Sequence, residues 1–234
     1  MPQSATVDEA EHEKRLAAQA AAELVESGMS VGLGTGTTVA QLLDVLAGRR
    51  LRLRCVATSP RTEQAARALG LAVEEFGTIE RIDLAIDGAD QVSPDGWLVK
   101  GGGAAHTREK IVAASADRFV VIVDSAKPVP SLRPPVPLEL LAFGLDSTLR
   151  RLRAIGPVRR RDVAPSPDGG VICDYLGPVE DPALLAGAFD AVPGVVEHGL
   201  FPPELVAEVF VGRGDMVERV PVIPRREATR PDRP

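Results

Sequence analysis

Aromatic residues are scarce in this 234-residue chain, at 3% of the sequence, although hydrophobic residues reach 44%. A substantial core is therefore expected, and it must be built from alanine, valine, leucine and isoleucine. No apolar run approaches the ~18 residues of a membrane-spanning helix, which predicts that the protein does not act at a membrane. Residues 1–15 are acidic and lack the apolar segment of a signal peptide, so a cytoplasmic location is expected.

Cysteine and positive charge are also in short supply. The two cysteines, Cys55 and Cys173, lie far apart in β-like runs and outside any C-x-x-C pattern, which predicts buried free thiols rather than a zinc site or a disulfide framework. The net charge of −6 argues against nucleic-acid binding. Arginines do cluster at 150–153 and 159–161, where we expect a solvated helix face and a solvated strand edge. The sequence predicts no metal site and no cofactor.

Strand-like and helix-like segments alternate through the first half of the chain. Helices are predicted at 8–26, 39–46, 62–69 and 107–116, and strands at 29–33, 51–57, 71–76, 82–86, 96–99 and 119–124. Ser59 and Pro60 form a typical helix start, with the serine as N-cap and the proline in the first turn. The alternation predicts an α/β fold with a Rossmann-like, mainly parallel sheet flanked by helices.

The composition changes at residues 128–137, which hold five prolines and predict a hinge. Beyond it, helices are predicted at 138–154 and 181–189, and strands at 158–163, 171–175, 195–200, 205–211 and 216–222. We therefore predict a small inserted α+β domain at 133–203 and a main catalytic domain made of 1–132 plus 204–224. Residues 225–234 are predicted to be a disordered tail.

A loop rich in glycine and threonine lies between the strand predicted at 29–33 and the helix that follows. It contains Gly34, Thr35, Gly36, Thr37 and Thr38. Backbone N–H groups at a helix N-terminus, together with hydroxyls, suit an anion. The loop lacks the lysine of a Walker A motif and the third glycine of a dinucleotide fingerprint. It therefore predicts a cradle for a phosphate or for sugar hydroxyls, with a plain capped turn as the alternative.

Two carboxylates three residues apart, Asp87 and Asp90, follow the strand predicted at 82–86, with Gly88 and Ala89 between them. This is the edge at which α/β sheets bind ligands. Three interpretations are open at this point. The carboxylates act as acid, base or hydroxyl ligands, or they hold Mg²⁺, or they form a simple Asx turn.

Three consecutive glycines, Gly101, Gly102 and Gly103, follow Lys100, and Glu109 lies on the helix predicted just beyond them. Without Cβ atoms, this loop can bring N–H donors close to a ligand. Donors, a cation and a possible base on one connection predict a catalytic loop. The alternative is a flexible turn followed by a solvated helix face.

Two further lysines could reach an anion at the same edge. Lys127 follows the strand predicted at 119–124, and Lys14 lies on the first predicted helix; either could instead be a surface residue. The strand ends of a parallel sheet meet at one edge, so these motifs should converge. With carboxylates, cations and N–H donors but no evident nucleophile, the set suits proton abstraction next to a carbonyl in a phosphorylated small molecule.

Six motifs, in this order, resemble ribose-5-phosphate isomerase type A. They are G-x-G-T-G-T-T, T-S-x-x-T-E-x-A, I-D-G-A-D, K-G-G-G-A-A-x-T-R-E-K-I, D-S-A-K-P and P-G-V-V-E-x-G-L-F, and the resemblance runs from about residue 12 to residue 222. It implies a metal-free aldose-ketose isomerase of the non-oxidative pentose phosphate pathway. Such an enzyme interconverts D-ribose 5-phosphate and D-ribulose 5-phosphate through an enediolate. A homodimer or homotetramer is also implied.

The resemblance further implies a role for each matching residue. Glu109 matches the general base, Asp87 a carboxylate for ring opening and proton traffic, and Asp90 a substrate-binding carboxylate. Lys100 and the N–H groups of Gly101 and Gly102 match the enediolate-stabilising site. The phosphate site corresponds to Thr35, Gly36, Thr37 and Thr38 with Lys127 and Lys14, and Gly88, Ala89 and Gly103 complete the expected substrate-binding residues.

Three residues depart from the family pattern: His106 where an apolar residue is expected, Gln91 in place of glutamate, and His198 in place of asparagine. Two other functions remain to be weighed. One is a related sugar-phosphate isomerase or amino-sugar-phosphate deaminase, which would require a catalytic histidine. The other is a non-catalytic sugar-phosphate sensor, which is disfavoured because no helix-turn-helix segment is present.

Overall fold

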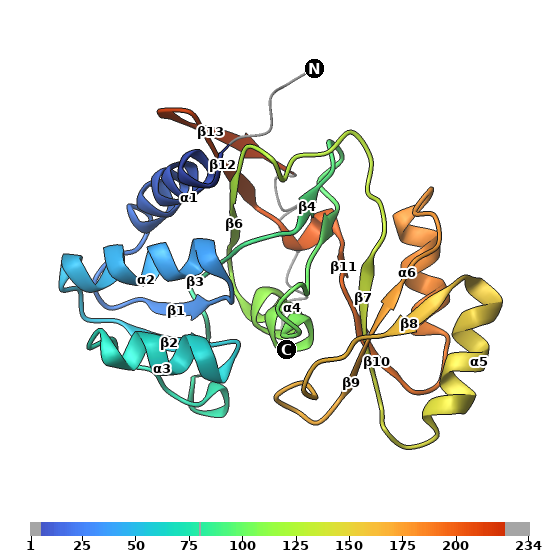
Figure 1. The fold of residues 1–234 in the computed structure, drawn as a ribbon. Helices are drawn as coiled ribbons and strands as arrows, with labels where there is room; N and C mark the ends of the chain where they lie inside the picture. Colours follow the sequence, from blue (N-terminus) through green and yellow to red (C-terminus); the bar gives the residue numbers. More distant parts are fainter. Residues whose placement is uncertain (1–5, 80, 223–234) are drawn as a thin grey trace, which may run out of the picture.

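A six-stranded sheet forms the centre of the computed structural model, which describes residues 6–79 and 81–222 (Figure 1). The strand order is β13-β12-β6-β3-β1-β2. The strands are β1 (Ser30–Leu33), β2 (Arg54–Ala57), β3 (Leu84–Asp87), β6 (Phe119–Asp124), β12 (Glu208–Arg213) and β13 (Met216–Pro221). All neighbours run parallel except β13, which pairs antiparallel with β12. The prediction of a mainly parallel, Rossmann-like sheet is confirmed.

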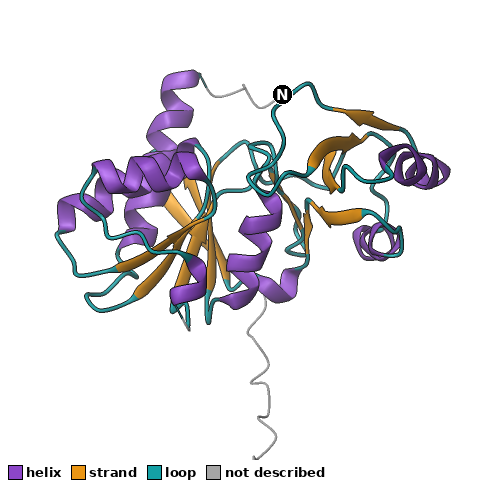
Figure 2. Cartoon of the chain, turned by 90° about the horizontal axis from the view of Figure 1, so that it is seen from below, coloured by secondary structure: helices purple, strands orange, loops and turns teal. Residues whose placement is uncertain are grey.

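Helices cover both faces of this sheet (Figure 2). They are α1 (Val7–Ala22), α2 (Thr37–Arg49), α3 (Pro60–Ala68) and α4 (His106–Ser115). The predicted start of α3 is confirmed, since the Ser59 side chain accepts the N–H of Thr62 and Pro60 occupies the first turn. At the start of α1, Thr6 and Glu9 form a reciprocal capping box, which satisfies backbone N–H groups that a helix leaves free.

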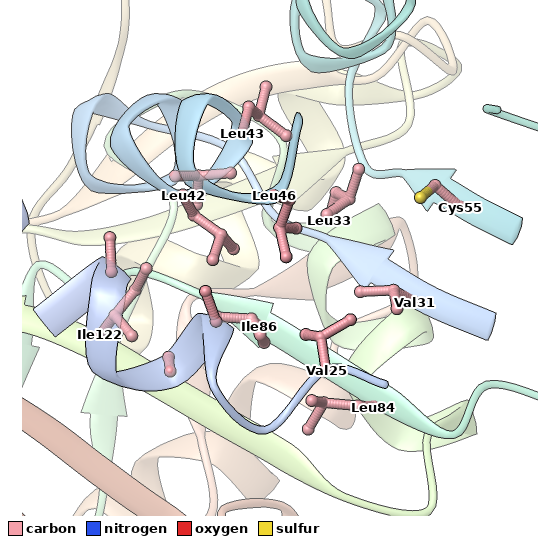
Figure 3. Packing of buried hydrophobic residues seen from close by; sticks show 14 of the residues in the cluster. Val25, Val31, Leu33, Leu42, Leu43, Leu46, Cys55, Leu84, Ile86 and Ile122 are labelled. Carbon is pink, nitrogen blue, oxygen red and sulfur yellow. The ribbon is translucent and has the colours of Figure 1, made fainter. Parts of the chain in front are cut away.

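The period-two pattern of the strands divides the core between the two faces. Leu84 and Ile86 of β3 pack with α1 and α2 (Figure 3), whereas Ala85 between them packs on the opposite face with Val112 and Ala113 of α4. The first face is lined by small α1 side chains, among them Ala17, Ala18 and Ala21, which let this helix lie close to the strands. The core is thus mainly aliphatic, as the composition predicts, although it also buries Phe119, Phe189, Phe201 and Phe210 completely.

A second, antiparallel sheet of order β10-β7-β9-β8 forms the small α+β domain (Figure 1, right). Its elements are β7 (Val136–Leu140), α5 (Leu145–Ile155), β8 (Val158–Arg160), β9 (Val171–Tyr175), α6 (Pro182–Asp190) and β10 (Val195–His198). Short strands β4 (Gln91–Val92), β5 (Leu98–Val99) and β11 (Leu200–Phe201) form a third sheet of order β11-β5-β4. Two 3₁₀ turns lie at Phe76–Thr78 and Pro203–Leu205.

Two predicted elements are wrong. The helix predicted at 138–154 begins only at Leu145, because 136–140 is a central strand that is buried along its whole length, and Gly144 at φ 69° separates the two. The strand predicted at 71–76 reduces to a single parallel bridge between Val73 and Cys55. Leu71 and Val73 still reach the core, so the apolar pattern reports burial there rather than sheet pairing.

Cys55 and Cys173 are buried free thiols, as predicted. Within the described ranges, no helix is long and apolar enough to cross a membrane. The domain boundaries at 133 and 203 stay a prediction, and the tail predicted at 225–234 lies outside the described residues.

Candidate active site

The predicted site residues meet at one pocket, at the edge of the main sheet where β1, β3 and β6 end. The pocket is lined by Lys14, Thr35, Gly36, Thr37, Thr38, Gly88, Ala89, Asp90, Lys100, Gly101, Gly102, Gly103, Glu109 and Lys127. Of the residues proposed from the sequence, Asp87 does not line this pocket; it lies directly beneath it, paired with Lys100. The parallel sheet therefore brings together residues more than 100 positions apart in the chain.

A buried lysine between two buried carboxylates forms the floor of the pocket. The Nζ atom of Lys100 lies 2.8 Å from an Asp87 carboxylate oxygen and 3.2 Å from a Glu109 carboxylate oxygen. These three side chains are at most 5% exposed. Lys100 also donates to the backbone carbonyl of Gly88. One cation thus faces two carboxylates that have little exposure to solvent, so each charge depends strongly on the others.

Burial and the second carboxylate together raise the pKa of Glu109 to about 8. Lys100 opposes this shift, but its charge is shared with Asp87. Burial alone would lower the pKa of Lys100; Asp87 and Glu109 outweigh burial and raise the pKa above its usual range, which keeps the ammonium charged. A carboxylate with so high a pKa is a stronger base than a solvated glutamate, which suits abstraction of a weakly acidic proton.

The charged carboxylate of Asp87 has more hydrogen-bond partners than that of Glu109. Burial raises its pKa, while Lys100 and the N–H groups of Gly88 and Thr35 favour its charged form. Those N–H groups donate to its Oδ1 atom at 2.7 Å and 3.0 Å. The approach requires a glycine at position 34, since a Cβ there would lie 1.9 Å from the Asp87 carboxyl group. The first glycine of the Gly/Thr loop therefore makes room for a carboxylate from the neighbouring strand.

The Gly/Thr loop leads directly into α2. Gly36, with φ at 134°, occupies the N-cap position and supplies no side-chain cap, so N–H groups of the first turn are available to an anion. The Thr35 hydroxyl is within hydrogen-bond distance of those of Thr58, Ser59 and Thr62, which fixes the loop against the start of α3. These features are those of an anion cradle.

The two outlying lysines border the same end of the pocket. Lys127 is half-buried and makes no ion pair with any described residue. Lys14 pairs with Glu11 at 2.7 Å and is 15% exposed. A free ammonium group beside an uncapped helix start favours an anionic ligand group at this end.

At the opposite side, the glycine loop contacts Asp90, which follows β3. The N–H group of Gly102 donates to a carboxylate oxygen of Asp90 at 2.8 Å. The Gly102 N–H was expected to face the reacting oxygen of a substrate. In this structure it is instead hydrogen-bonded to Asp90. Gly101, with φ at 106°, adopts a backbone conformation that favours glycine, and its carbonyl accepts the Ala104 N–H at 3.1 Å.

The sequence missed one contact of this loop. Arg161 was expected on a solvated strand edge, but its side chain is 16% exposed and its Nη1 atom donates to the carbonyl oxygen of Gly101 at 2.9 Å. Its partner Asp174 is also buried. The signal in the sequence is weak: one of three adjacent arginines, and a single aspartate inside a strand that is otherwise mostly apolar.

The two histidines singled out in the sequence lie deep in the protein. His106 is fully buried against Gly101, and neither ring nitrogen makes a well-formed hydrogen bond within the described chain. Burial lowers its pKa to about 3, although the nearby Glu197 backbone favours the protonated ring. His106 does not line the pocket. The catalytic histidine that a deaminase would need is therefore not found in the pocket.

His198 lies near Asp190 and Glu197, a group of side chains that could hold a metal by type and distance. The Nδ1 atom of His198 accepts the Leu200 N–H at 3.2 Å, so its Nε2 atom carries the proton and faces Asp190 at 3.3 Å. Lys110 forms an ion pair with Glu197. The atoms of this group that could bind a metal are thus already paired within the protein, and they do not fit a cation.

A sheet edge that combines an anion cradle with a buried lysine–carboxylate cluster defines the class of this protein: an α/β enzyme for proton transfer on an anionic small molecule. The model of the family described as Ribose 5-phosphate isomerase A (phosphoriboisomerase A) matches residues 54–216. The chain belongs to this family.

Known relatives agree over nearly the whole chain. Ribose-5-phosphate isomerase A of Caulobacter sp. (strain K31) is 45% identical over 215 residues, covering 87% of this chain and 95% of that protein. The structure of ribose 5-phosphate isomerase A from Methanocaldococcus jannaschii superposes with a TM-score of 0.86 at 32% identity, covering 90% and 99% of the two chains. A D-ribose-5-phosphate isomerase in complex with phospho-erythronic acid also gives a TM-score of 0.86, at 30% identity and 91% and 99% coverage.

Replacing His106 with leucine is predicted to stabilise the protein by about 1–2 kcal/mol, because it removes a buried polar ring that lacks good partners. The gain should grow as the pH falls below about 6.5. There the unfolded chain takes up a proton on His106 that the folded protein, with its lowered pKa, does not. Denaturant unfolding of both proteins at about pH 5 and pH 8 measures this. A less stable variant at both pH values would contradict the prediction.

Proposed function

We propose that this pocket interconverts D-ribose 5-phosphate and D-ribulose 5-phosphate with Glu109 as the general base. The observation that carries the proposal is the position of Glu109: it lines the pocket, its carboxylate is buried, and it faces Lys100 at 3.2 Å. The carboxylate takes the proton from C2 of the open-chain aldose, and the electrons move to the C1 oxygen to give an enediolate. Returning that proton to C1, while the proton of the C2 hydroxyl moves to the C1 oxygen, gives the ketose.

The enediolate is the species that the pocket must stabilise. Lys100 supplies a fixed positive charge, because its two carboxylate partners keep its amino group protonated. The N–H groups of Gly101 and Gly102 are the nearby neutral donors on the glycine loop. In a buried site, donors aimed at a developing oxyanion contribute roughly 10²–10³ in rate each. The Gly102 N–H becomes available when a substrate hydroxyl or oxyanion takes the place of Asp90, which then binds the substrate itself.

Asp87 has two functions in this proposal. As the family resemblance implies, it helps open the sugar ring and moves protons among the sugar oxygens. Its position beneath the pocket supports a second one, because its charge raises the pKa of Glu109 and keeps Lys100 protonated. Both functions depend on the same buried ion pair at 2.8 Å.

The phosphate of the substrate is assigned to the cradle formed by residues 35–38, with Lys127 and Lys14 beside it. The similar structure in complex with phospho-erythronic acid supports a phosphorylated ligand here. We also propose, from the family resemblance, a cytoplasmic homodimer or homotetramer. A sensor function is disfavoured, because a binding domain has no need of a buried base with a raised pKa beside the ligand pocket.

Replacing Glu109 with glutamine should lower kcat for ribose 5-phosphate at least ~10²-fold, because the amide cannot accept the C2 proton. The wild-type enzyme should turn over in the presence of a chelator. Glu63→Gln, a half-exposed glutamate outside the pocket, is the matched control and should keep wild-type kcat. Coupled detection of ribulose 5-phosphate measures all three. A Glu109→Gln variant with full activity, or an inactive wild type, would refute the assignment.

Removing the ammonium group of Lys127 or of Lys14, by substitution with methionine, should raise KM for ribose 5-phosphate about tenfold or more while changing kcat less. Both lysines border the end assigned to the phosphate, which does not react. Arg15→Met, at an exposed position next to Lys14 on α1, is the control for a general loss of positive charge. An unchanged KM in both lysine variants would place the phosphate elsewhere.

A further inference from the structure

Arg161 connects the small domain to the glycine loop of the pocket. It follows β8, and its guanidinium group lies between two partners. On one side, Nε lies 2.9 Å and Nη2 2.6 Å from the carboxylate of Asp174 in β9. On the other side, Nη1 donates to the carbonyl oxygens of Gly101 at 2.9 Å and Gly102 at 3.3 Å.

The Asp174 carboxylate decides which way the guanidinium points. It is buried and occupies two of the three guanidinium nitrogens, which leaves Nη1 for the loop. This use of a planar fork is specific to arginine, because a lysine ammonium cannot engage a carboxylate on one side and hold a fixed donor direction on the other. The pair is therefore a rigid bracket between two sheets.

The carbonyl contacts determine where the loop N–H groups point. In a planar trans peptide, the C=O of one residue and the N–H of the next point in opposite directions. Holding the Gly101 carbonyl therefore fixes the direction of the Gly102 N–H, and holding the Gly102 carbonyl fixes that of the Gly103 N–H. Gly101 and Gly102 have no side chains to pack. The Ala104 N–H on the Gly101 carbonyl and Asp90 on the Gly102 N–H also hold these peptides, and Arg161 adds the contact from the small domain.

We propose that Arg161 is a positioning residue for the isomerisation: it orients the peptide dipoles of the glycine loop toward the enediolate and is itself oriented by Asp174. The inference rests on the function proposed above for this loop. It also gives the small domain a part in catalysis, since the guanidinium comes from that domain and the peptides that it holds belong to the pocket.

The test measures kcat and KM of Arg161→Met. Donor misplacement affects the transition state more than the bound substrate, so kcat should fall about 10–100-fold with KM within about threefold. Arg161→Lys should recover only part of the loss. Arg160→Met, at the exposed neighbouring position, is the control and should match the wild type. Wild-type kcat in Arg161→Met would overturn the inference while leaving the isomerase assignment intact, whereas an inactive wild type would overturn the assignment itself.

A second variant separates positioning from stability, because Arg161→Met leaves the buried Asp174 charge unpaired and can destabilise the fold. Replacing both partners, as Arg161→Met with Asp174→Leu, removes that charge and should restore the thermal midpoint to near the wild-type value. The loop still lacks its bracket, so kcat should stay low. Recovery of kcat together with stability would show that the arginine acts only on the fold, and would overturn the inference.

Discussion

A single buried ammonium group, that of Lys100, is the interaction on which the site depends. It faces two buried carboxylates, so the two carboxylates share one counterion. The charged form of Glu109 is the less well stabilised of the two. Asp87 also accepts two backbone N–H groups, whereas Glu109 has Lys100 alone among its described hydrogen-bond and ion-pair partners. The arrangement costs stability and yields reactivity, as is common where a fold holds a base ready for use.

The parallel sheet makes this arrangement possible, since it brings strand ends from distant parts of the chain to one edge. The loop after β1 provides the anion cradle and the glycine that lets Asp87 approach, while β3 provides Asp87 itself. The loop after β5 provides Lys100, and α4 presents Glu109 in its first turn. The small domain packs against this edge from the other side, through contacts such as Thr107 with Glu139 and Lys100 N–H with the Gly199 carbonyl.

Much of this could be predicted from the sequence, because the signals are local. The strand β1, the Gly/Thr loop and the start of α2 follow each other within a few residues. Ser59 and Pro60 directly predict the start of a helix. The errors have a different origin. Residues 138–140 fit a helical pattern but form a central strand, because tertiary burial overrides a weak local preference. Arg161 looked like a surface charge, because its partners Asp174 and Gly101 are distant in the chain. His106 departs from the family pattern, and its burial without good partners could be seen only in three dimensions.

The raised pKa of Glu109 links the buried cluster to the proposed chemistry, and it can be measured directly. Titration of the Glu109 side-chain carboxyl by carbon NMR in ¹³C-labelled protein, assigned with the Glu109→Gln variant, reports it without reference to turnover. A pKa of about 8 is expected for Glu109 in the wild type. A lower pKa is expected in Asp87→Asn, where the neighbouring negative charge is gone. A wild-type pKa near the ordinary 4.5 would contradict the claim that burial and Asp87 prepare Glu109 as the base.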